Sequence, residues 1–287
     1  MQIGIGLPNP IPDTQGRTLV EWARRAEARG FSTLATIDRI AYPNYDSLIS
    51  LAAAAAVTER IGLLTNVLLA PTRNPVVLAK AAASVDQISG GRLTLGLGVG
   101  GREDDYIATG LDFKTRGRRF DADLELLHRA WKGEPVAGSP KPVTPTPVHD
   151  GRVPILIGGS ADAAIERTLR WGAGWTMAGS AAQAAPFLAR IRQAWQEAGK
   201  PGKPRIAGLI YFGLGPNADT GIPAYIKDYY SFTPWPEQLA AGVPRTAEAL
   251  QGVVKEFEDL DIDELIFDPT IAEIAQVDLL ADAVLRK

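Results

Sequence analysis

Eight short apolar segments alternate with helical segments along the chain, and this alternation constrains the fold more than any other feature of the sequence. Each apolar segment is bounded by Gly, Pro, Asn or Asp, which predicts a buried strand. The expected strands are Gln2–Leu7, Phe31–Ile37, Ile61–Leu69, Leu93–Val99, Pro154–Ile157, Gly174–Ala178, Arg205–Leu214 and Glu264–Phe267. Strict alternation implies parallel strands, and eight repeats predict an α/β fold, a single (β/α)8 TIM barrel.

The expected helices follow the strands one by one, and several have sequence signals at their ends. Asp46 and Asn74 are candidate N-caps, Pro75 stands at a first helical position, and Gly30 is a candidate C-cap. The expected helices are Arg17–Arg29, 47–59, Pro75–Ile88, Arg116–Trp131, Ala161–Trp171, Ala181–Ala198, Arg245–Leu260 and Ala272–Arg286.

Two stretches without periodicity interrupt the alternation. Residues 132–153 are rich in proline and follow the fourth helix, whereas residues 215–243 are rich in Tyr, Phe, Trp and Pro and follow the seventh strand. No change in composition marks a second domain, so residues 1–287 are expected to form one barrel domain with two irregular insertions.

Composition excludes several classes of function. The net charge of −3 offers no basic surface for nucleic acid, and no apolar run is long enough to span a membrane. The chain begins with a strand instead of a signal peptide and has no cysteine, so we expect a cytoplasmic protein without disulfides or Cys-ligated metals. His128 and His149 are the only histidines, which disfavours a histidine metal site or a catalytic triad. These absences point to a bound cofactor that acts on a small-molecule substrate.

The segment Ser89–Glu103 combines a buried strand with a cluster of glycines. Gly96, Gly98, Gly100 and Gly101 end the strand and let a ligand or another backbone approach closely. They match the dinucleotide pattern G-x-G-x-x-G, but that motif needs a helix at its third glycine, and the next strong helix is expected only near Arg116. An NAD-dependent dehydrogenase on a doubly wound sheet is therefore a weaker alternative, as is a purely structural glycine-rich strand.

Ligands of a TIM barrel bind at the carboxyl ends of its strands. Two of these ends, Gly158–Ser160 and Ala178–Ser180, are small turns that precede helices. Free backbone N–H groups at a helix N-terminus bind anions, so both turns are candidate sites for a phosphate-bearing ligand.

Several segments in the expected order resemble the bacterial luciferase-like flavin-dependent oxidoreductases. They are LLTNVLLAPTRNPVVLAK (63–80), VDQISGGRLTLGLGVGGRE (85–103) and ILIGGS (155–160), with DRIAYPNYD (38–46) and DELIFDPT (263–270). The likeness covers nearly the whole chain. It implies an oxidoreductase that uses either reduced FMN with oxygen, supplied by a separate flavin reductase, or the deazaflavin coenzyme F420 for hydride transfer. A homodimer is also expected.

The resemblance also implies roles for individual residues. The pair Asn66–Val67 is similar to a strand bulge whose non-prolyl cis peptide bond backs the flavin ring. The residues that resemble the rest of the cofactor site are Gly98, Val99 and Gly100 at the ring or its ribityl chain, and Gly158, Gly159, Ser160, Gly179 and Ser180 at the phosphate. Glu103 is similar to an acid that protonates near the ring in some F420 enzymes, although a solvated charge paired with Arg102 is an equal alternative.

Two departures from the family pattern concern the reacting centre. Asp38-Arg39 stands where many relatives have Asp-His, and the turn AGSAA (178–182) lacks a lysine that binds phosphate in some F420 enzymes. The sugar-phosphate dehydrogenase mechanism therefore does not transfer directly. We expect Asp38, Arg39 and Glu103 near the reacting centre, and a catalytically silent flavin-binding barrel is the main alternative.

The aromatic stretch 215–243 follows a strand at the predicted active face. It contains Tyr225, Tyr229, Tyr230, Phe232 and Trp235. We interpret it as a lid that covers an apolar substrate and excludes water. A self-packed loop or an oligomer contact would have the same composition.

Overall fold

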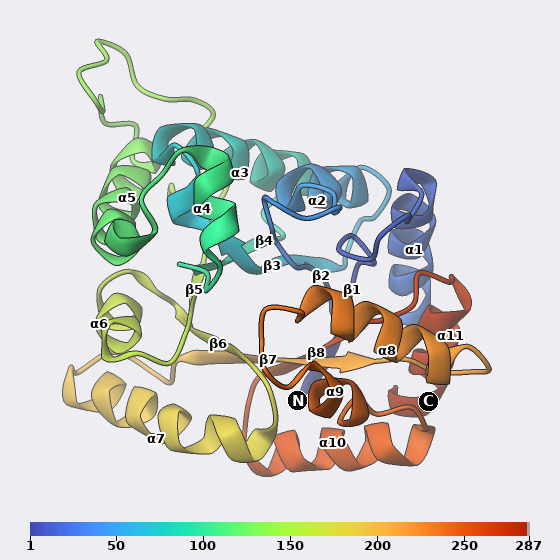
Figure 1. Cartoon of the computed structure of the whole chain (residues 1–287). Coiled ribbons are helices and arrows are strands. Elements are labelled where there is room, and N and C mark those ends of the chain that lie inside the picture. The colour runs from blue at the N-terminus through green and yellow to red at the C-terminus, as the bar shows by residue number, and fades with distance from the viewer. Residues whose placement is uncertain (286–287) are drawn as a thin grey trace.

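The computed structural model describes residues 1–285 and confirms the barrel. Eight parallel strands pair in chain order, and the pairing of the first strand with the last closes the sheet (Figure 1). The strands are β1 (Gln2–Gly6), β2 (Thr33–Thr36), β3 (Gly62–Leu69), β4 (Leu93–Gly98), β5 (Ile155–Gly158), β6 (Gly174–Ala178), β7 (Arg205–Phe212) and β8 (Glu264–Pro269). A closed barrel rules out the doubly wound sheet and, with it, the NAD-dependent alternative.

Helices surround the strands in Figure 1. They are α1 (Gly16–Arg29), α2 (Ser47–Ala55), α3 (Pro75–Ser89), α4 (Glu103–Thr109), α5 (Arg116–Trp131), α6 (Asp162–Trp171), α7 (Ala181–Glu197), α8 (Ala218–Tyr229), α9 (Pro236–Ala241), α10 (Ala247–Asp259) and α11 (Ala275–Val284). The expected caps are confirmed: Asp46 accepts from the Ile49 N–H, Asn74 accepts from the Val76 and Val77 N–H groups, and Gly30 ends α1 with φ +89°. Arg286, the expected end of the last helix, lies outside the described residues.

The stretch after the glycines of β4 differs from expectation, because α4 begins at Glu103 and not near Arg116. Glu103, Asp104 and Asp105 all lie in its first turn, where negative charge interacts favourably with the helix dipole. Asp105 and Tyr106 are buried and fix the helix against the barrel. This segment was not predicted as a helix because most of its residues are polar.

The insertion at residues 215–243 was also wrongly expected to be irregular. It contains α8 and α9, and Pro223 lies inside α8. Ile222, Tyr225, Ile226 and Tyr229 are buried at helical spacing and pack with Ile37 and Leu209 of the barrel. The helices thus cover the carboxyl ends of β2 and β7. The other insertion, residues 132–153, has neither helix nor strand, as expected.

The barrel interior contains an apolar layer. Ala35, Leu64, Leu156, Ala207 and Ile266 form a buried cluster. Towards the carboxyl ends of the strands, Asn66, Gly158 and Thr176 line a cavity together with apolar side chains. Within the described part of the chain, no helix is long and apolar enough to cross a membrane.

Candidate active site

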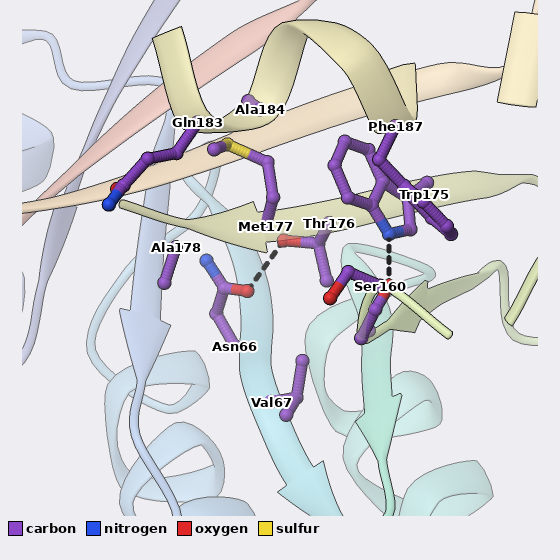
Figure 2. A pocket seen from close by; sticks show the side chains of 12 residues that line it. Asn66, Val67, Ser160, Trp175, Thr176, Met177, Ala178, Gln183, Ala184 and Phe187 are labelled. Carbon is purple, nitrogen blue, oxygen red and sulfur yellow. Dashed lines mark hydrogen bonds between the residues drawn. The ribbon is translucent and has the colours of Figure 1, made fainter. Parts of the chain in front are cut away.

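The centre of the candidate site is a bulge in β3. The pairing of β3 with β4 shifts register between Thr65 and Leu68, and the Asn66–Val67 peptide bond inside this bulge is cis, as the resemblance implied. The bulge turns both residues towards the cavities at the carboxyl ends of the strands (Figure 2).

The Val67 side chain lies between two glycines of neighbouring strands. A Cβ atom on Gly98 would lie 2.8 Å from Val67 Cγ2, and a Cβ atom on Gly158 would lie 2.8 Å from Val67 Cγ1. Ordinary carbon–carbon contacts are about 3.5–4.0 Å, so neither position tolerates a side chain while Val67 stays in place. These two glycines therefore accommodate the bulge itself, in addition to any role towards a ligand.

Asn66 is held by one hydrogen bond and keeps a free donor. The Thr176 hydroxyl of β6 donates to Asn66 Oδ1 at 2.7 Å, and Figure 2 shows this hydrogen bond between the two side chains. The Asn66 amide nitrogen is buried and has no partner among the described residues. A buried donor without a partner is costly, and a ligand acceptor would satisfy it.

A cavity of about 480 Å³ lies beside this bulge, between β3, β5, β6 and the start of α7. Asn66, Val67, Gly158–Ser160, Thr176 and Gln183 line it, together with Trp175, Met177 and Phe187. Its size is within the range of pockets that bind cofactors. No Lys or Arg of residues 1–285 lines it, so any anion here would depend on backbone N–H and neutral side-chain donors.

The turn Gly158–Ser160 is shaped for close approach. Gly159 has φ +102°, and a Cβ atom there would have no neighbour within 4 Å, so the turn faces open space. Trp175 Nε1 donates to the Gly159 carbonyl at 2.8 Å, which directs the Ser160 N–H of the same peptide away from the indole. The helix that follows, α6, begins at Asp162, and its N-cap residue Ala161 provides no side-chain cap. Its first N–H groups are therefore available to an anion.

The second predicted phosphate turn is occupied by its own helix cap. Ser180 Oγ accepts from the Gln183 N–H at 3.3 Å, and Gln183 Oε1 accepts from the Ser180 N–H at 3.0 Å. Gly179 and Ser180 line an adjoining cavity of about 380 Å³, which shares Ala178 and Gln183 with the first. The structure therefore places these two residues beside the first cavity and not in its lining.

A third cavity, of about 230 Å³, also lies beside the cis peptide and shares Asn66, Val67 and Ala178 with the first. We call it the inner cavity. Asp38 and Arg39 of the β2 end line it with Gly100, and the aromatic end of α8 covers it through Tyr229, Tyr230 and Phe232. The structure thus brings two of the three expected catalytic residues to the bulge.

Asp38 is enclosed in a bidentate ion pair. Arg73 donates to its two oxygens at 2.7 and 2.9 Å, and the Leu69 N–H donates to it at 2.9 Å. Burial raises the pKa of Asp38, and the Arg73 guanidinium opposes that rise. With its oxygens bonded in this way, Asp38 fixes the end of β3 relative to β2. Sequence analysis did not single out Arg73.

Arg39 is buried and held by α4. Its Nε donates to Asp105 and its Nη2 donates to Asp104, both at 2.7 Å. Asp105 also accepts from the Ile40 and Ala41 N–H groups, so one carboxylate holds the whole β2 loop. Arg39 Nη1 is buried without a partner in the described chain.

Glu103 is separated from the bulge. It is exposed at the start of α4 and lines an outer cavity of about 540 Å³ with Arg39, Arg102 and Asp228. Within residues 1–285 it forms no ion pair with Arg102. Instead, the Arg102 guanidinium lies 4.3 Å from the ring centre of Tyr229 and 4.1 Å from that of Phe232.

The two remaining predicted residues lie in the β4 loop. Gly100 has φ +68° and a Cβ atom there would lie 2.9 Å from Leu69, so only glycine suits this turn. The Val99 carbonyl accepts a hydrogen bond from the Tyr106 hydroxyl, which joins the loop to α4.

Asp268 is a further polar group that sequence analysis did not assign. It lies at the end of β8, fully enclosed, and neither carboxylate oxygen has a partner among the described residues. Burial raises its pKa well above the ordinary value. Gly6 makes room for it, because a Cβ atom there would lie 1.7 Å from Asp268 Oδ1. Tyr211 of β7 stands beside it in register.

A closed parallel barrel with adjoining cavities at the carboxyl ends of its strands is the arrangement of a barrel enzyme. A family model described as luciferase-like monooxygenase matches residues 1–269. The chain therefore belongs to the luciferase-like monooxygenase family and is an oxidoreductase.

The chain is also similar to individual proteins and solved structures. The Mycobacterium tuberculosis protein Rv0940c is 32% identical over 208 residues, which cover 62% of this chain and 71% of the relative. An F420-dependent secondary alcohol dehydrogenase, solved with an F420–acetone adduct, has a TM-score of 0.81 at 17% identity, covering 100% of this chain and 99% of that one. The oxygenating constituent of 3,6-diketocamphane monooxygenase from Pseudomonas putida, solved with FMN, has a TM-score of 0.75 at 17% identity, covering 99% and 98%. At these identities the two structures show the fold.

Proposed function

We propose that this protein is a cytoplasmic oxidoreductase that binds FMN or F420 at the carboxyl ends of its strands and acts on a small organic substrate. Asn66 and Val67, at the cis peptide bond, would hold the ring, and Gly158–Ser160 would hold the phosphate-bearing tail. The observation that carries this proposal is the cavity of about 480 Å³ beside the bulge, with the unpartnered Asn66 amide and the open face of Gly159 in its lining. Structural neighbours of the chain contain F420 or FMN.

The residues of this chain position and shield the reactants. A bound flavin or deazaflavin supplies hydride transfer or, as reduced FMN with oxygen, oxygenation. Thr176 fixes the Asn66 side chain, whose free N–H would be available to the ring, and Trp175 fixes the Gly159 peptide, which would hold the phosphate. Tyr229 and Tyr230 cover the inner cavity and exclude water from it.

The three expected catalytic residues take different parts in this proposal. Arg39 lines the inner cavity and contacts substrate, whereas Asp38 is a positioning residue that acts through Arg73 and the end of β3. Glu103 lines the outer cavity and contacts ligands that enter through it. We also propose that the protein forms a homodimer and that, if it uses FMN, a separate reductase supplies the reduced flavin.

The test is a parallel fluorescence titration of the full chain with oxidised FMN and with oxidised F420. Binding of F420 alone supports hydride transfer, and binding of FMN alone supports oxygenation with a separate reductase. Tight binding without turnover of any reductant and acceptor would identify a catalytically silent binder. Binding of neither cofactor would overturn the proposal.

A further inference from the structure

The inner cavity is lined by one arginine, Arg102, that forms no ion pair with any described residue and lies within an aromatic wall. Its two carboxylates are already bonded, because Asp38 pairs with Arg73 and Asp105 pairs with Arg39 and two backbone N–H groups. Arg102 also lines this cavity, and within residues 1–285 it has no ion pair and no hydrogen bond. A guanidinium has five N–H donors, so this one keeps its hydrogen-bonding capacity for a ligand.

The Arg102 guanidinium is held without any carboxylate. It lies over the rings of Tyr229 and Phe232, with distances of 4.3 and 4.1 Å from the guanidinium carbon to the ring centres. A cation–π contact with these rings supplies no oxygen or nitrogen acceptor for the guanidinium N–H groups. The same rings close the inner cavity, so the cation and the apolar wall form one surface.

Arg39 also lines the inner cavity and has one unused donor. Its Nε and Nη2 are committed to Asp105 and Asp104, which fix the planar group, while Nη1 is buried and unpartnered. The side chain is only 4% exposed. A fixed guanidinium with one free nitrogen is preorganised for an oxygen acceptor.

We propose that the inner cavity binds a substrate that carries a carboxylate on a small apolar or aromatic body, with the carboxylate at Arg102 and Arg39. This inference rests on the proposed function, because it names the substrate class of that site. The volume of about 230 Å³ is below the usual range for drug-sized ligands and suits a single ring with a short acid chain. Glu103, Asp104 and Asp228 line the neighbouring outer cavity, and their negative charge reduces the affinity for a carboxylate ligand. Solvent screens these three groups, which limits the reduction.

The experiment is calorimetric titration of the full chain with phenylacetate and with phenylacetamide, a neutral analogue of the same shape. It is performed with and without saturating cofactor. The expected result is at least tenfold tighter binding of the acid than of the amide. Arg102→Gln should remove this preference and leave amide binding unchanged, whereas Arg102→Lys should retain part of it. Glu103→Gln should tighten acid binding, because it removes a nearby negative charge.

Arg170→Gln is the matched control, since Arg170 also lies over an aromatic ring, at 4.6 Å from Trp171, but lies on α6 outside the inner cavity. The Arg170→Gln variant should prefer phenylacetate over phenylacetamide by the same factor as the original protein. Equal affinities for the acid and the amide would overturn the inference. If Arg102→Gln loses binding of both ligands, the inference is also overturned, because Arg102 would then only pack the aromatic wall. If cofactor titration succeeds while acid selectivity fails, the inference alone is wrong. If neither cofactor binds, the proposed function fails as well.

Discussion

Replacing Gly158 by Ala tests whether Val67 is confined as the structure describes. The new Cβ atom would lie 2.8 Å from Val67 Cγ1 and 3.6 Å from Cγ2. Relieving the first contact requires a shift of more than about 0.5 Å, since ordinary carbon contacts begin near 3.5 Å. Val67 cannot move freely because Gly98 confines it on the opposite side. Overpacking of this kind costs about 1–3 kcal/mol of unfolding free energy.

The assay is a double-mutant cycle measured by urea unfolding. Val67→Ala alone removes methyl groups from a partly buried side chain and should cost roughly 1 kcal/mol. In the double variant Gly158→Ala/Val67→Ala the clash is absent, so its stability should nearly equal that of Val67→Ala. The expected coupling free energy is therefore about 1–3 kcal/mol.

Gly101→Ala is the control in the same region. A Cβ atom there would have no neighbour within 4 Å, and its φ lies outside the left-handed range, so we expect a change within about 0.5 kcal/mol. Additive effects of Gly158→Ala and Val67→Ala, within about 0.5 kcal/mol, would refute the reasoning. Such a result would mean that Val67 does not fill the space between the two glycines.

Two further predictions concern the cofactor turn and the buried carboxyl. Gly159→Ala should lower cofactor affinity at least tenfold in a fluorescence titration. The control is Gly30→Ala, which has a similar φ of +89° and equally open surroundings, and which should lose comparable stability but keep its cofactor affinity. Equal cofactor affinities in the two variants would contradict the assignment of the turn to phosphate binding. For Asp268 the folded pKa is raised by burial, so the folded state binds the extra proton and stability falls as pH rises from the unfolded pKa near 3.8 towards the folded value. Asp268→Asn should remove a slope on the order of 1 kcal/mol per pH unit, measured by urea unfolding from pH 5 to 8, and identical slopes in both proteins would show that Asp268 stays ionised.

The barrel could be predicted from the sequence because its signals are local. Each strand is a short apolar run, and the helix caps at Asp46 and Asn74 are read from adjacent residues. Helix α8 could also have been found, since Ile222, Tyr225, Ile226 and Tyr229 have helical spacing, but Pro223 and the aromatic composition favoured a loop.

The candidate site was predictable only as a set of strand ends. Its decisive contacts join residues far apart in the sequence: Thr176 bonds Asn66 across 110 positions, and Asp105 holds Arg39 across 66. No local pattern indicates such pairs. The alternative reading of Glu103, a pairing with Arg102, shows the same limit, because the start of α4 and the end of α8 together determine where the Arg102 guanidinium lies.

The measurement that tests the central claim most directly is a crystal structure of the full chain with whichever oxidised cofactor, FMN or F420, binds in titration. We expect the ring against the cis Asn66–Val67 bond, the Asn66 amide donating to a ring acceptor, and the phosphate on the N–H groups of Gly158–Ser160. A cofactor bound elsewhere, for example in the surface cavity between α10 and α11, would contradict the account.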